Sequence, residues 1–261
     1  MIPSVPDSTT SLSMSDVTPD SASHAPSPPA ASQRVRRVYF IQNEPRVHAA
    51  QLAIDVRSLG VETHVIEAWR YPTDFFDTFE PDDPIVILGG TMNAYADEVA
   101  PWFGSLRQLM SRASMSGTKL LGICLGHQLL AVARGGRVSV ADPAGKEQSV
   151  TPIEWVTGDP FVDAIKSPAV VFEDHADAVT VMPPQAVALA TSSRYLQAMR
   201  IGSAISVQFH PEVNTHLITE WYSADEPENL PRYLSEYRAH ASALRELSCR
   251  IAQWLTDPSV T

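Results

Sequence analysis

The stretch KLLGICLGHQLLAVARGG, residues 119–136, decides the fold that we predict for this chain. It begins with an apolar run at residues 119–123, which is typical of a strand buried on both faces of a parallel sheet. Residues 126–134 then have the pattern of a short helix, which ends at the glycine pair 135–136. A strand that leads directly into a helix is part of a βαβ crossover, so this stretch predicts a parallel sheet covered by helices.

A cysteine stands at the junction of this strand and this helix. Cys124 has Gly122 and Gly126 two residues away on either side. This spacing is typical of a sharp strand-to-helix elbow, because glycine lets backbone segments approach where a Cβ atom would clash. Such an elbow exposes a nucleophile at the carboxyl end of the sheet, beside a helix N-terminus that favours a thiolate and an oxyanion. A buried packing role is the alternative for a free cysteine, and the pattern alone leaves both roles open.

The rest of the chain continues the alternation of strands and helices and then changes character. Strands are predicted at 35–41, 61–66 and 84–88, and helices at 47–59 and 101–114. Short β-like runs dominate the second half, which ends in helices; the runs are 149–155, 169–172, 186–190, 196–200 and 204–209, and the helices 214–222 and 231–255. We therefore predict an α/β fold: an open, mostly parallel sheet flanked by helices in a flavodoxin-like three-layer arrangement, with extra antiparallel strands in the second half.

Composition excludes several classes of protein. The 261 residues are 44% hydrophobic and 19% charged, which allows a sizeable core, and the formal net charge of −11 makes nucleic acid a poor partner. Two cysteines fit a reducing compartment, and no apolar run is long enough to span a membrane. We expect a soluble, cytoplasmic protein that binds neither nucleic acid nor membrane. The eight histidines show no metal-ligand spacing, so no metal or other cofactor is expected.

The first 33 residues differ from the rest of the chain. They contain nine Ser and six Pro and no aromatic residue, so they cannot bury enough apolar area to offset the entropy of ordering. They lack the basic and apolar regions of a secretory signal. We predict a disordered tail at 1–33 and one domain at 34–261.

Two histidines are candidates for a catalytic base. In the segment QFHPE, residues 208–212, His210 and Glu212 are two residues apart, so in an extended segment both side chains leave the same face. The carboxylate can then orient the ring, whose other nitrogen faces a thiol. His175 has Asp177 at the same spacing, so spacing does not decide between the two. We rank His210 first because Pro211 favours an extended backbone there.

Acyl transfer also needs hydrogen-bond donors for the developing oxyanion. The N–H group of Leu125, the residue after the cysteine, is one candidate. The segment 89–91 (Gly-Gly-Thr), which follows a predicted neighbouring strand, is the other, although a pair of glycines alone is typical of an ordinary turn.

At this point the sequence resembles a known family. The motifs GICLGHQ at 122–128, QFHPE at 208–212 and LGGTMN at 88–93 are similar, in order and spacing, to those of the triad-type (class I) glutamine amidotransferases. The resemblance covers residues 35–256. The stretch at 89–98, followed by Pro-Trp, is most similar to stand-alone members of the GMP-synthase-like kind.

The resemblance implies roles for particular residues. It implies Cys124 as the nucleophile, His210 as the general base and acid, and Glu212 as the residue that orients His210. It implies the backbone N–H groups of Gly90 and Leu125 as the oxyanion donors.

The resemblance also implies a set of substrate-binding residues. Gln128 corresponds to a glutamine that contacts the backbone of the substrate, and Asp174, His175 and Asp177 fall where the family contacts the substrate's amino and carboxylate groups. Two residues depart from the family pattern: Ala176 replaces a glycine, and Thr91 replaces a proline. If that glycine is needed for a positive φ or a close approach, Ala176 alters the fit of the substrate.

The implied reaction is hydrolysis of the side-chain amide of glutamine through a γ-glutamyl thioester. The sequence contains no phosphate-binding loop for activating an acceptor, so a synthetase partner in trans is implied, or water as the only acceptor. One alternative is a γ-glutamyl peptide or amide hydrolase on the same scaffold. An alternative of another class is a non-catalytic regulatory or binding protein that retains the fold.

Overall fold

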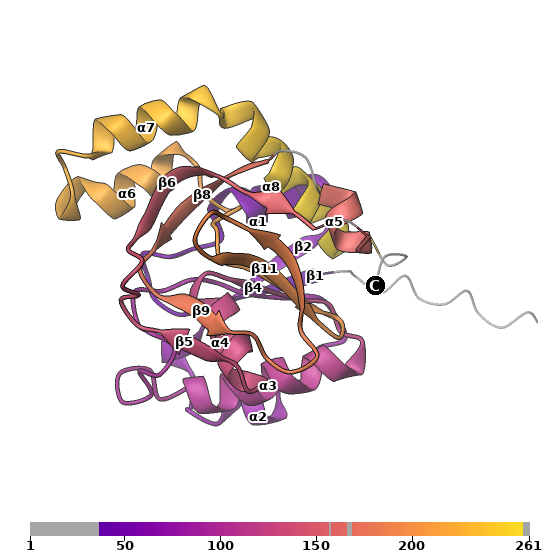
Figure 1. Cartoon of the computed structure of the whole chain (residues 1–261). Coiled ribbons are helices and arrows are strands. Elements are labelled where there is room, and N and C mark those ends of the chain that lie inside the picture. Colours follow the sequence, from indigo (N-terminus) through magenta and orange to yellow (C-terminus); the bar gives the residue numbers. More distant parts are fainter. Residues whose placement is uncertain (1–36, 157, 166–168, 258–261) are drawn as a thin grey trace, which may run out of the picture. The chain divides into compact units, whose positions relative to one another are not determined.

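The computed structural model describes residues 37–156, 158–165 and 169–257 (Figure 1). The predicted disordered tail, residues 1–33, lies outside these ranges and remains a prediction, as does the domain boundary at residue 34.

A central eight-stranded sheet organises the described residues, with the strand order β2-β1-β3-β4-β12-β11-β10-β7. The first five strands in this order pair in parallel; they are β2 (Glu62–Glu67), β1 (Arg37–Gln42), β3 (Ile85–Ile87), β4 (Leu120–Ile123) and β12 (Ala204–Val207). The last three are antiparallel; they are β11 (Leu196–Ile201), β10 (Val187–Thr191) and β7 (Glu154–Trp155). The predicted α/β fold, mostly parallel with extra antiparallel strands in the second half, is confirmed.

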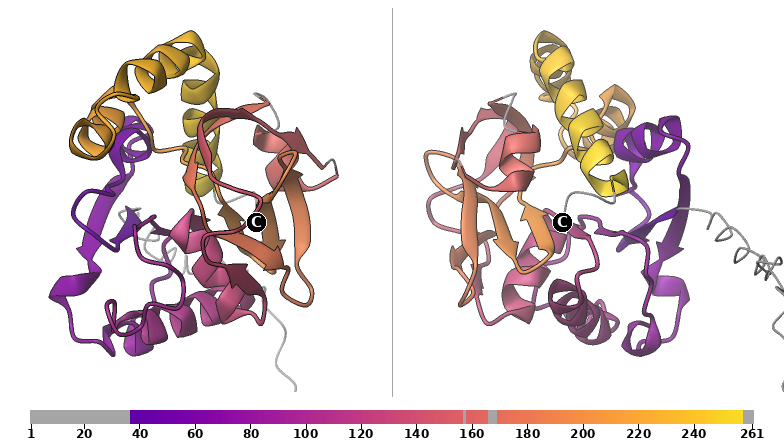
Figure 2. Two further views of the ribbon diagram at one scale, coloured as in Figure 1. Left: turned by 60° about the vertical axis from the view of Figure 1, so that its left-hand side comes forward. Right: turned by 90° about the vertical axis from the view of Figure 1, so that its right-hand side faces the viewer.

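Two apolar cores lie on the two faces of this sheet, as the continuous apolar runs of β3 and β4 predict. Leu121 and Ile123 belong to the core on one face, whereas Leu120 belongs to the core on the other. The first face is covered by α1 (Ala50–Ser58), α5 (Pro160–Ile165) and α8 (Ala241–Thr256). The second face is covered by α2 (Phe75–Thr78), α3 (Phe103–Ser116) and α4 (Leu125–Ala133). Figure 2 shows α1 and α8 on the side of the sheet opposite to α2 and α3.

The second half of the chain also forms two small antiparallel sheets of two strands each, separate from the central sheet. They are β5 (Arg137–Ser139) with β9 (Ala178–Val181), and β6 (Glu147–Pro152) with β8 (Val170–His175). A short 3-10 helix, η1 (Ala68–Arg70), follows β2. The sequence patterns indicated strand character around β6 and β8 but neither their pairing nor β5 and β9.

The predicted single helix at 231–255 is wrong, because two helices occupy this region. They are α7 (Leu230–Ala239) and α8, and they meet at His240. Tyr233 and Tyr237 of α7 pack with α6 (Thr215–Asp225) in a third apolar cluster, whereas α8 packs on the central sheet. The apolar residues of this region therefore pack into two different cores, and the chain turns between them. None of the helices in the described residues combines the length and the apolar character needed to cross a membrane.

Candidate active site

The junction of β4 and α4 is a strained elbow with Cys124 at its tip. Cys124 has φ 50° and ψ −105°, a conformation that a residue with a Cβ atom adopts only where the surrounding structure imposes it. A Cβ atom on Gly126 would lie 2.4 Å from the carbonyl oxygen of Ile87, and one on Gly122 would lie 2.6 Å from the carbonyl oxygen of Gly126. Both glycines are therefore required by close backbone approach, as their spacing predicted. The other cysteine, Cys249, is half-buried on α8.

His210 and Glu212 follow β12, the strand next to β4. The N–H group of Cys124 donates to the carbonyl oxygen of Val207 at 2.9 Å, so the ends of the two strands are fixed side by side. His210 Nδ1 donates to Glu212 Oε1 at 2.8 Å, and the two side chains are 4% and 0% exposed. This contact is the predicted one, but it is made in a turn rather than in an extended segment, because β12 ends at Val207.

The side chain of Cys124 lies beside the His210 ring in the same pocket and interacts with it electrostatically. Burial acts to lower the pKa of His210, but Glu212 and then Cys124 outweigh it, and the pKa of His210 is raised well above its ordinary value. A ring that holds its proton at neutral pH can stand as an imidazolium beside a thiolate. The edge of this ring packs against Trp221, with 4.9 Å between the ring centroids, so the ring is also held sterically.

His175, the rival base, has different partners. Its Nδ1 atom donates to the backbone carbonyl of Asp177 at 2.9 Å, and its Nε2 atom lies 3.3 Å from Glu147 Oε2. The Asp177 carboxylate instead accepts from the N–H group of Ala141 at 2.8 Å. Only the 210–212 pair therefore forms the carboxylate–imidazole–thiol chain, and spacing gave no signal of this difference.

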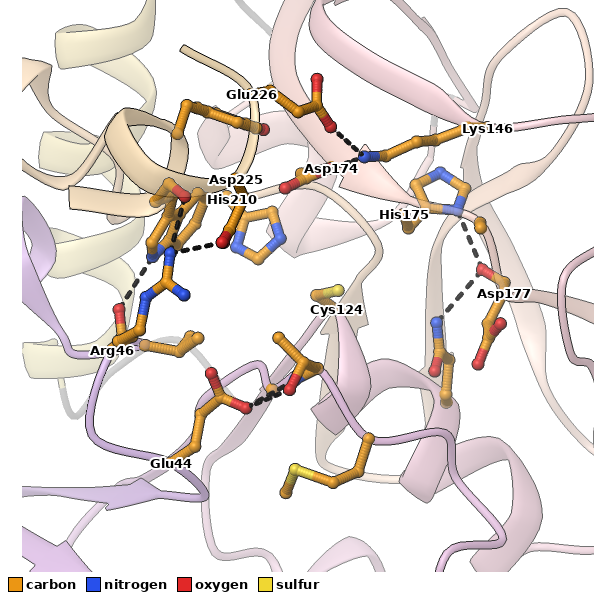
Figure 3. Close-up of a pocket in the computed structure, with 18 residues that line it drawn as sticks. Glu44, Arg46, Cys124, Lys146, Asp174, His175, Asp177, His210, Asp225 and Glu226 are labelled. Atoms are coloured by element: carbon orange, nitrogen blue, oxygen red, sulfur yellow. Dashed lines mark hydrogen bonds and ion pairs between the residues drawn. The ribbon is translucent and has the colours of Figure 1, made fainter. Parts of the chain in front are cut away.

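A pocket of about 320 Å³ opens over Cys124 (Figure 3). Figure 3 shows the cysteine between His210 on one side and the pair His175 and Asp177 on the other. Among the predicted site residues, seven line this pocket: Gly90, Cys124, Gln128, Asp174, His175, Asp177 and His210. Glu212 is buried behind His210, and Leu125 begins α4, where its N–H group has no acceptor within the helix.

The rim of the pocket carries charged residues that sequence patterns did not reveal. These additional lining residues are the charged Glu44, Arg46, Lys146, Asp225 and Glu226, together with the aromatic Trp221. Lys146 Nζ lies 2.9 Å from Asp174 Oδ1 and 3.4 Å from Glu226 Oε1, and Arg46 Nη2 lies 2.7 Å from Asp225 Oδ2. They come from segments far apart in the sequence, and no motif links them. The rim is therefore a set of ion pairs assembled by the tertiary fold.

Residues that follow β1 hold the loop after β3 in place through hydrogen bonds. Asn43 Nδ2 donates to the carbonyl oxygen of Leu88 at 2.8 Å, and Glu44 Oε2 accepts from the backbone N–H of Thr91 at 2.9 Å. A proline at position 91 would have no N–H group to donate. Thr91, which departs from the family pattern, therefore makes a hydrogen bond to Glu44 that a proline could not make. A Cβ atom on Gly90 would lie 2.8 Å from Cδ2 of Leu125, so a larger residue there would require the Leu125 side chain to move.

The second departure, Ala176, does not strain the backbone. Ala176 is not in the left-handed region that favours glycine, and its carbonyl oxygen accepts from the N–H group of Asp142 at 2.9 Å. A positive φ, the first of the two conditions under which Ala176 would alter the fit of the substrate, is therefore absent here; the second, a close approach, stays a prediction, and Ala176 lines the pocket.

A second group of ionisable side chains lies beside the pocket. Glu147, Glu173 and His175 are all buried, and each offers one potential metal-ligand atom within 4.8 Å of the others. Burial raises the pKa of Glu173 well above its ordinary value, and the nearby Glu147 adds to that increase. No spacing in the sequence revealed this group, because strand pairing brings its members together.

The open sheet and the strained cysteine turn define an α/β protein of the nucleophile-elbow type. The chain belongs to the class-I glutamine amidotransferase family, whose model matches residues 49–222. This confirms the family predicted from the three motifs.

Individual relatives differ in their described activities. The chain is 36% identical over 144 residues to a γ-glutamyl-L-1-hydroxyisopropylamide hydrolase of a Pseudomonas species, covering 51% of this chain and 48% of that protein. It is 31% identical over 145 residues to γ-glutamyl peptidase 5 of Arabidopsis thaliana, covering 53% and 57%. The chain thus matches about half the length of these two relatives. It is 30% identical to a glutamine-hydrolysing GMP synthase subunit of Methanococcoides burtonii, covering 60% of this chain and 78% of that one. Among solved structures, a glutamine amidotransferase from Thermotoga maritima has the same fold, with a TM-score of 0.75 at 24% identity over 85% of this chain and 99% of that one.

Proposed function

We propose that this protein hydrolyses the side-chain amide of glutamine through a covalent thioester on Cys124. The observation that carries the proposal is the chain of contacts from the Cys124 side chain through the His210 ring to the buried Glu212 carboxylate. Attack of the sulfur on the amide carbon forms a tetrahedral oxyanion. His210 then gives its proton to the departing nitrogen, and ammonia leaves. Water, deprotonated by His210, cleaves the thioester, which releases glutamate and restores the thiolate.

The backbone N–H groups of Gly90 and Leu125 are the proposed donors to the oxyanion. Gly90 lines the pocket beside Cys124, and Leu125 occupies the first turn of α4, where N–H groups point out of the helix. Close packing between Gly90 and the Leu125 side chain keeps the two segments together.

The glutamyl group is proposed to bind through Gln128, Asp174 and Asp177. Gln128 Nε2 donates to the carbonyl oxygen of Asp177 at 3.1 Å, so these residues already form one wall of the pocket. His175 Nδ1 donates to the carbonyl oxygen of Asp177 and Nε2 faces the buried Glu147, so we assign His175 a positioning role in this wall. The ammonia is proposed to go to a synthetase partner in trans, a role that the resemblance to the Methanococcoides GMP synthase subunit supports.

A second candidate function is hydrolysis of larger γ-glutamyl amides. The pocket volume of about 320 Å³ reaches the range of roughly 300–1,000 Å³ that holds drug-sized ligands, so it has room for a substituent on the amide nitrogen. The two γ-glutamyl hydrolase relatives act on such compounds according to their names. The same thioester chemistry applies, with an amine in place of ammonia as the leaving group.

One experiment tests both candidates. The purified chain is incubated with glutamine, γ-glutamyl dipeptides and γ-glutamyl alkylamides, and glutamate, ammonia and free amine are measured, with and without cell extract. Cys124→Ala serves as the control for Cys-dependent turnover, and labelling by a glutamine-analogue electrophile measures the competence of the thiol. Turnover of glutamine above the γ-glutamyl amides supports the first candidate, and the reverse order supports the second. Absence of both turnover and Cys124-dependent labelling supports a non-catalytic protein.

A further inference from the structure

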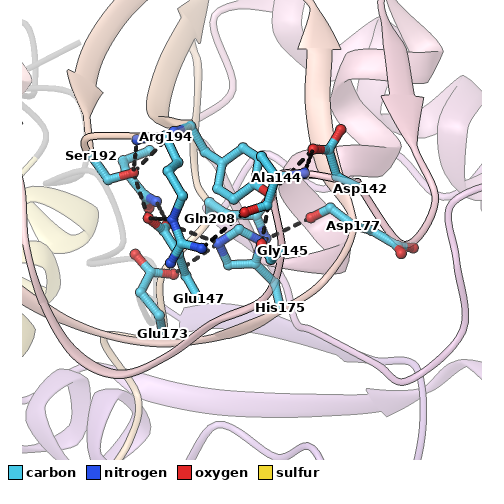
Figure 4. A network of polar contacts seen from close by, with 12 residues as sticks. Asp142, Ala144, Gly145, Glu147, Glu173, His175, Asp177, Ser192, Arg194 and Gln208 are labelled. Atoms are coloured by element: carbon cyan, nitrogen blue, oxygen red, sulfur yellow. Dashed lines mark hydrogen bonds and ion pairs between the residues drawn. The ribbon is translucent and has the colours of Figure 1, made fainter.

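The buried cluster of Glu147, Glu173 and His175 is created by the pairing of two strands (Figure 4). In the antiparallel ladder of β6 and β8, Glu147 lies opposite His175, and Glu173 lies two residues before His175 on the same face. The three residues are only 2%, 0% and 4% exposed. Three ionisable groups are thus enclosed together beside the pocket, and Glu173 is close enough to His210 to interact with it electrostatically.

The hydrogen bonding of His175 leaves one nitrogen facing two acids. Its Nδ1–H group donates to the carbonyl oxygen of Asp177 at 2.9 Å, so a neutral ring presents a lone pair at Nε2. That atom lies 3.3 Å from Glu147 Oε2 and 3.5 Å from Glu173 Oε2. A lone pair between two carboxylates is repelled by both of them, so either a proton or a metal cation must lie among the three groups.

Glu173 adds a second and separate indication of a ligand. Neither of its carboxylate oxygens has a hydrogen-bond partner, although the residue is fully buried. A buried carboxylate that makes no hydrogen bond is destabilising, so a proton or a cation is expected at this position. Glu147, by contrast, accepts from Ser192 Oγ at 2.8 Å and from Gln197 Nε2 at 2.7 Å.

We propose that Glu147, Glu173 and His175 bind one divalent cation of the zinc type, through His175 Nε2 and one oxygen of each carboxylate. A tetrahedral ion with metal–ligand bonds of about 2.0–2.1 Å places its ligand atoms roughly 3.3 Å apart. The two separations from His175 Nε2, 3.3 and 3.5 Å, match this geometry, and the two carboxylate oxygens lie within 4.8 Å of each other, so a small shift of one side chain would complete it. An imidazole ligand and only three protein ligands favour zinc over magnesium or calcium, which take more oxygen ligands.

The surroundings of the cluster match those of known metal sites. A ligating histidine usually donates its other N–H group to a carbonyl or carboxylate, as His175 does to Asp177, and ligating carboxylates are themselves hydrogen-bonded, as Glu147 is. Arg194 Nε already lies 3.3 Å from Glu147 Oε1, so a bound cation would mainly offset the charge of Glu173, and it would tie β6 to β8. Because the Asp177 carbonyl also accepts from Gln128, the ion would brace the wall of the pocket from behind.

The test uses full-length protein carrying Cys124→Ala, because a thiolate and His210 could themselves bind zinc. Metal-free protein is titrated with zinc chloride against a competing chromophoric chelator, and the melting temperature is measured with and without zinc. We expect one zinc ion per chain and a higher melting temperature with zinc. Adding Glu173→Gln should weaken binding by at least about tenfold and remove the zinc-dependent rise. Adding Glu154→Gln, at an exposed glutamate on β7, should change neither.

Glu173→Gln retains the shape of the side chain and removes a buried charge, so the metal-free variant should melt no lower than its parent. If that variant does not fold, anomalous scattering at the zinc edge from crystals of the Cys124→Ala protein gives the position of the ion directly. The proposal is overturned if the Cys124→Ala protein binds no zinc, if Glu173→Gln binds it as tightly as the parent, or if the ion lies elsewhere.

Discussion

Two Gly→Ala substitutions, each at the second residue of a helix, test the elbow quantitatively. Gly104 is the second residue of α3, and an added Cβ atom there meets no atom within 4 Å. Alanine is favoured over glycine within helices by up to about 1 kcal/mol, so Gly104→Ala should leave the free energy of unfolding unchanged or increase it by that amount. It is the matched control for the same substitution in α4.

Gly126, the second residue of α4, has no such room. Its added Cβ atom would lie 2.4 Å from the carbonyl oxygen of Ile87, and real Cβ contacts below 3.0 Å are essentially not found. The backbones of α4 and β3 must therefore separate by about 0.6 Å, although all three residues of β3 are buried. Overpacking of this kind costs about 1–3 kcal/mol, and here both atoms that clash are fixed to backbone. The shift also displaces Cys124, and a misplacement approaching 1 Å costs about 100-fold in rate.

Urea unfolding and thermal melting of the full chain measure the loss of stability. Electrophile labelling of Cys124 measures the effect of its displacement on reactivity. A loss of about 1–3 kcal/mol corresponds to a melting temperature lower by roughly 2–12 °C in a domain of this size. If Gly126→Ala unfolds within about 0.5 kcal/mol of Gly104→Ala and is labelled at the wild-type rate, then the close packing assigned to the elbow is refuted.

Three further predictions concern residues around the pocket. Because Glu212 raises the pKa of His210, Glu212→Gln should lower that pKa, move the alkaline limb of the pH–rate profile to lower pH and reduce turnover about 10³–10⁴-fold; an unchanged profile would contradict the assigned role. The Tyr233 hydroxyl is the main cause that lowers the pKa of Glu226 from 4.5 to about 2, so this carboxylate adds stability that is complete above pH 4.5 and is lost as the pH falls toward 2. Tyr233→Phe should therefore reduce the difference in unfolding free energy between about pH 6 and pH 3, measured by urea unfolding, and an identical difference would disprove the coupling. Ala176→Gly should keep kcat/KM within about threefold of wild type, because the backbone there does not require glycine; a large gain would show that the family glycine matters for another reason.

Local patterns predicted the central part of the fold well. The strand, elbow and helix expected over residues 119–136 are present as β4, Cys124 and α4. In this region the apolar run, the flanking glycines and the helix stop all act within a few residues of one another. Interactions between residues close in the sequence are therefore sufficient to predict this region. Repetition of the same strand–helix unit along the chain predicts the parallel sheet.

Features that depend on contacts across the chain were beyond the reach of sequence patterns. The two His-x-acid pairs have identical spacing, yet only His210 contacts the carboxylate two residues on, because each pair is shaped by the strands that surround it. The helix expected over 231–255 breaks at His240, because its two halves pack in different cores. The Glu147 cluster depends on the register of β6 and β8, which neither strand encodes by itself.

Because β4 and β12 are neighbours in the sheet, the positions of Cys124 and His210 depend mainly on one part of the chain and the lining of the pocket on another. The ladder between β4 and β12 sets most of the spacing between the sulfur and the imidazole, and the intervening chain from 125 to 203 adds one backbone hydrogen bond at this point, from the His210 N–H group to the carbonyl oxygen of Phe172. This intervening stretch supplies Gln128, Lys146 and the Asp174–Asp177 wall, and so determines much of what enters the pocket. Its loops can lengthen, shorten or change charge while the reacting atoms keep their distance. Evolution and protein engineers can therefore diversify substrate choice on this scaffold without reinventing its chemistry.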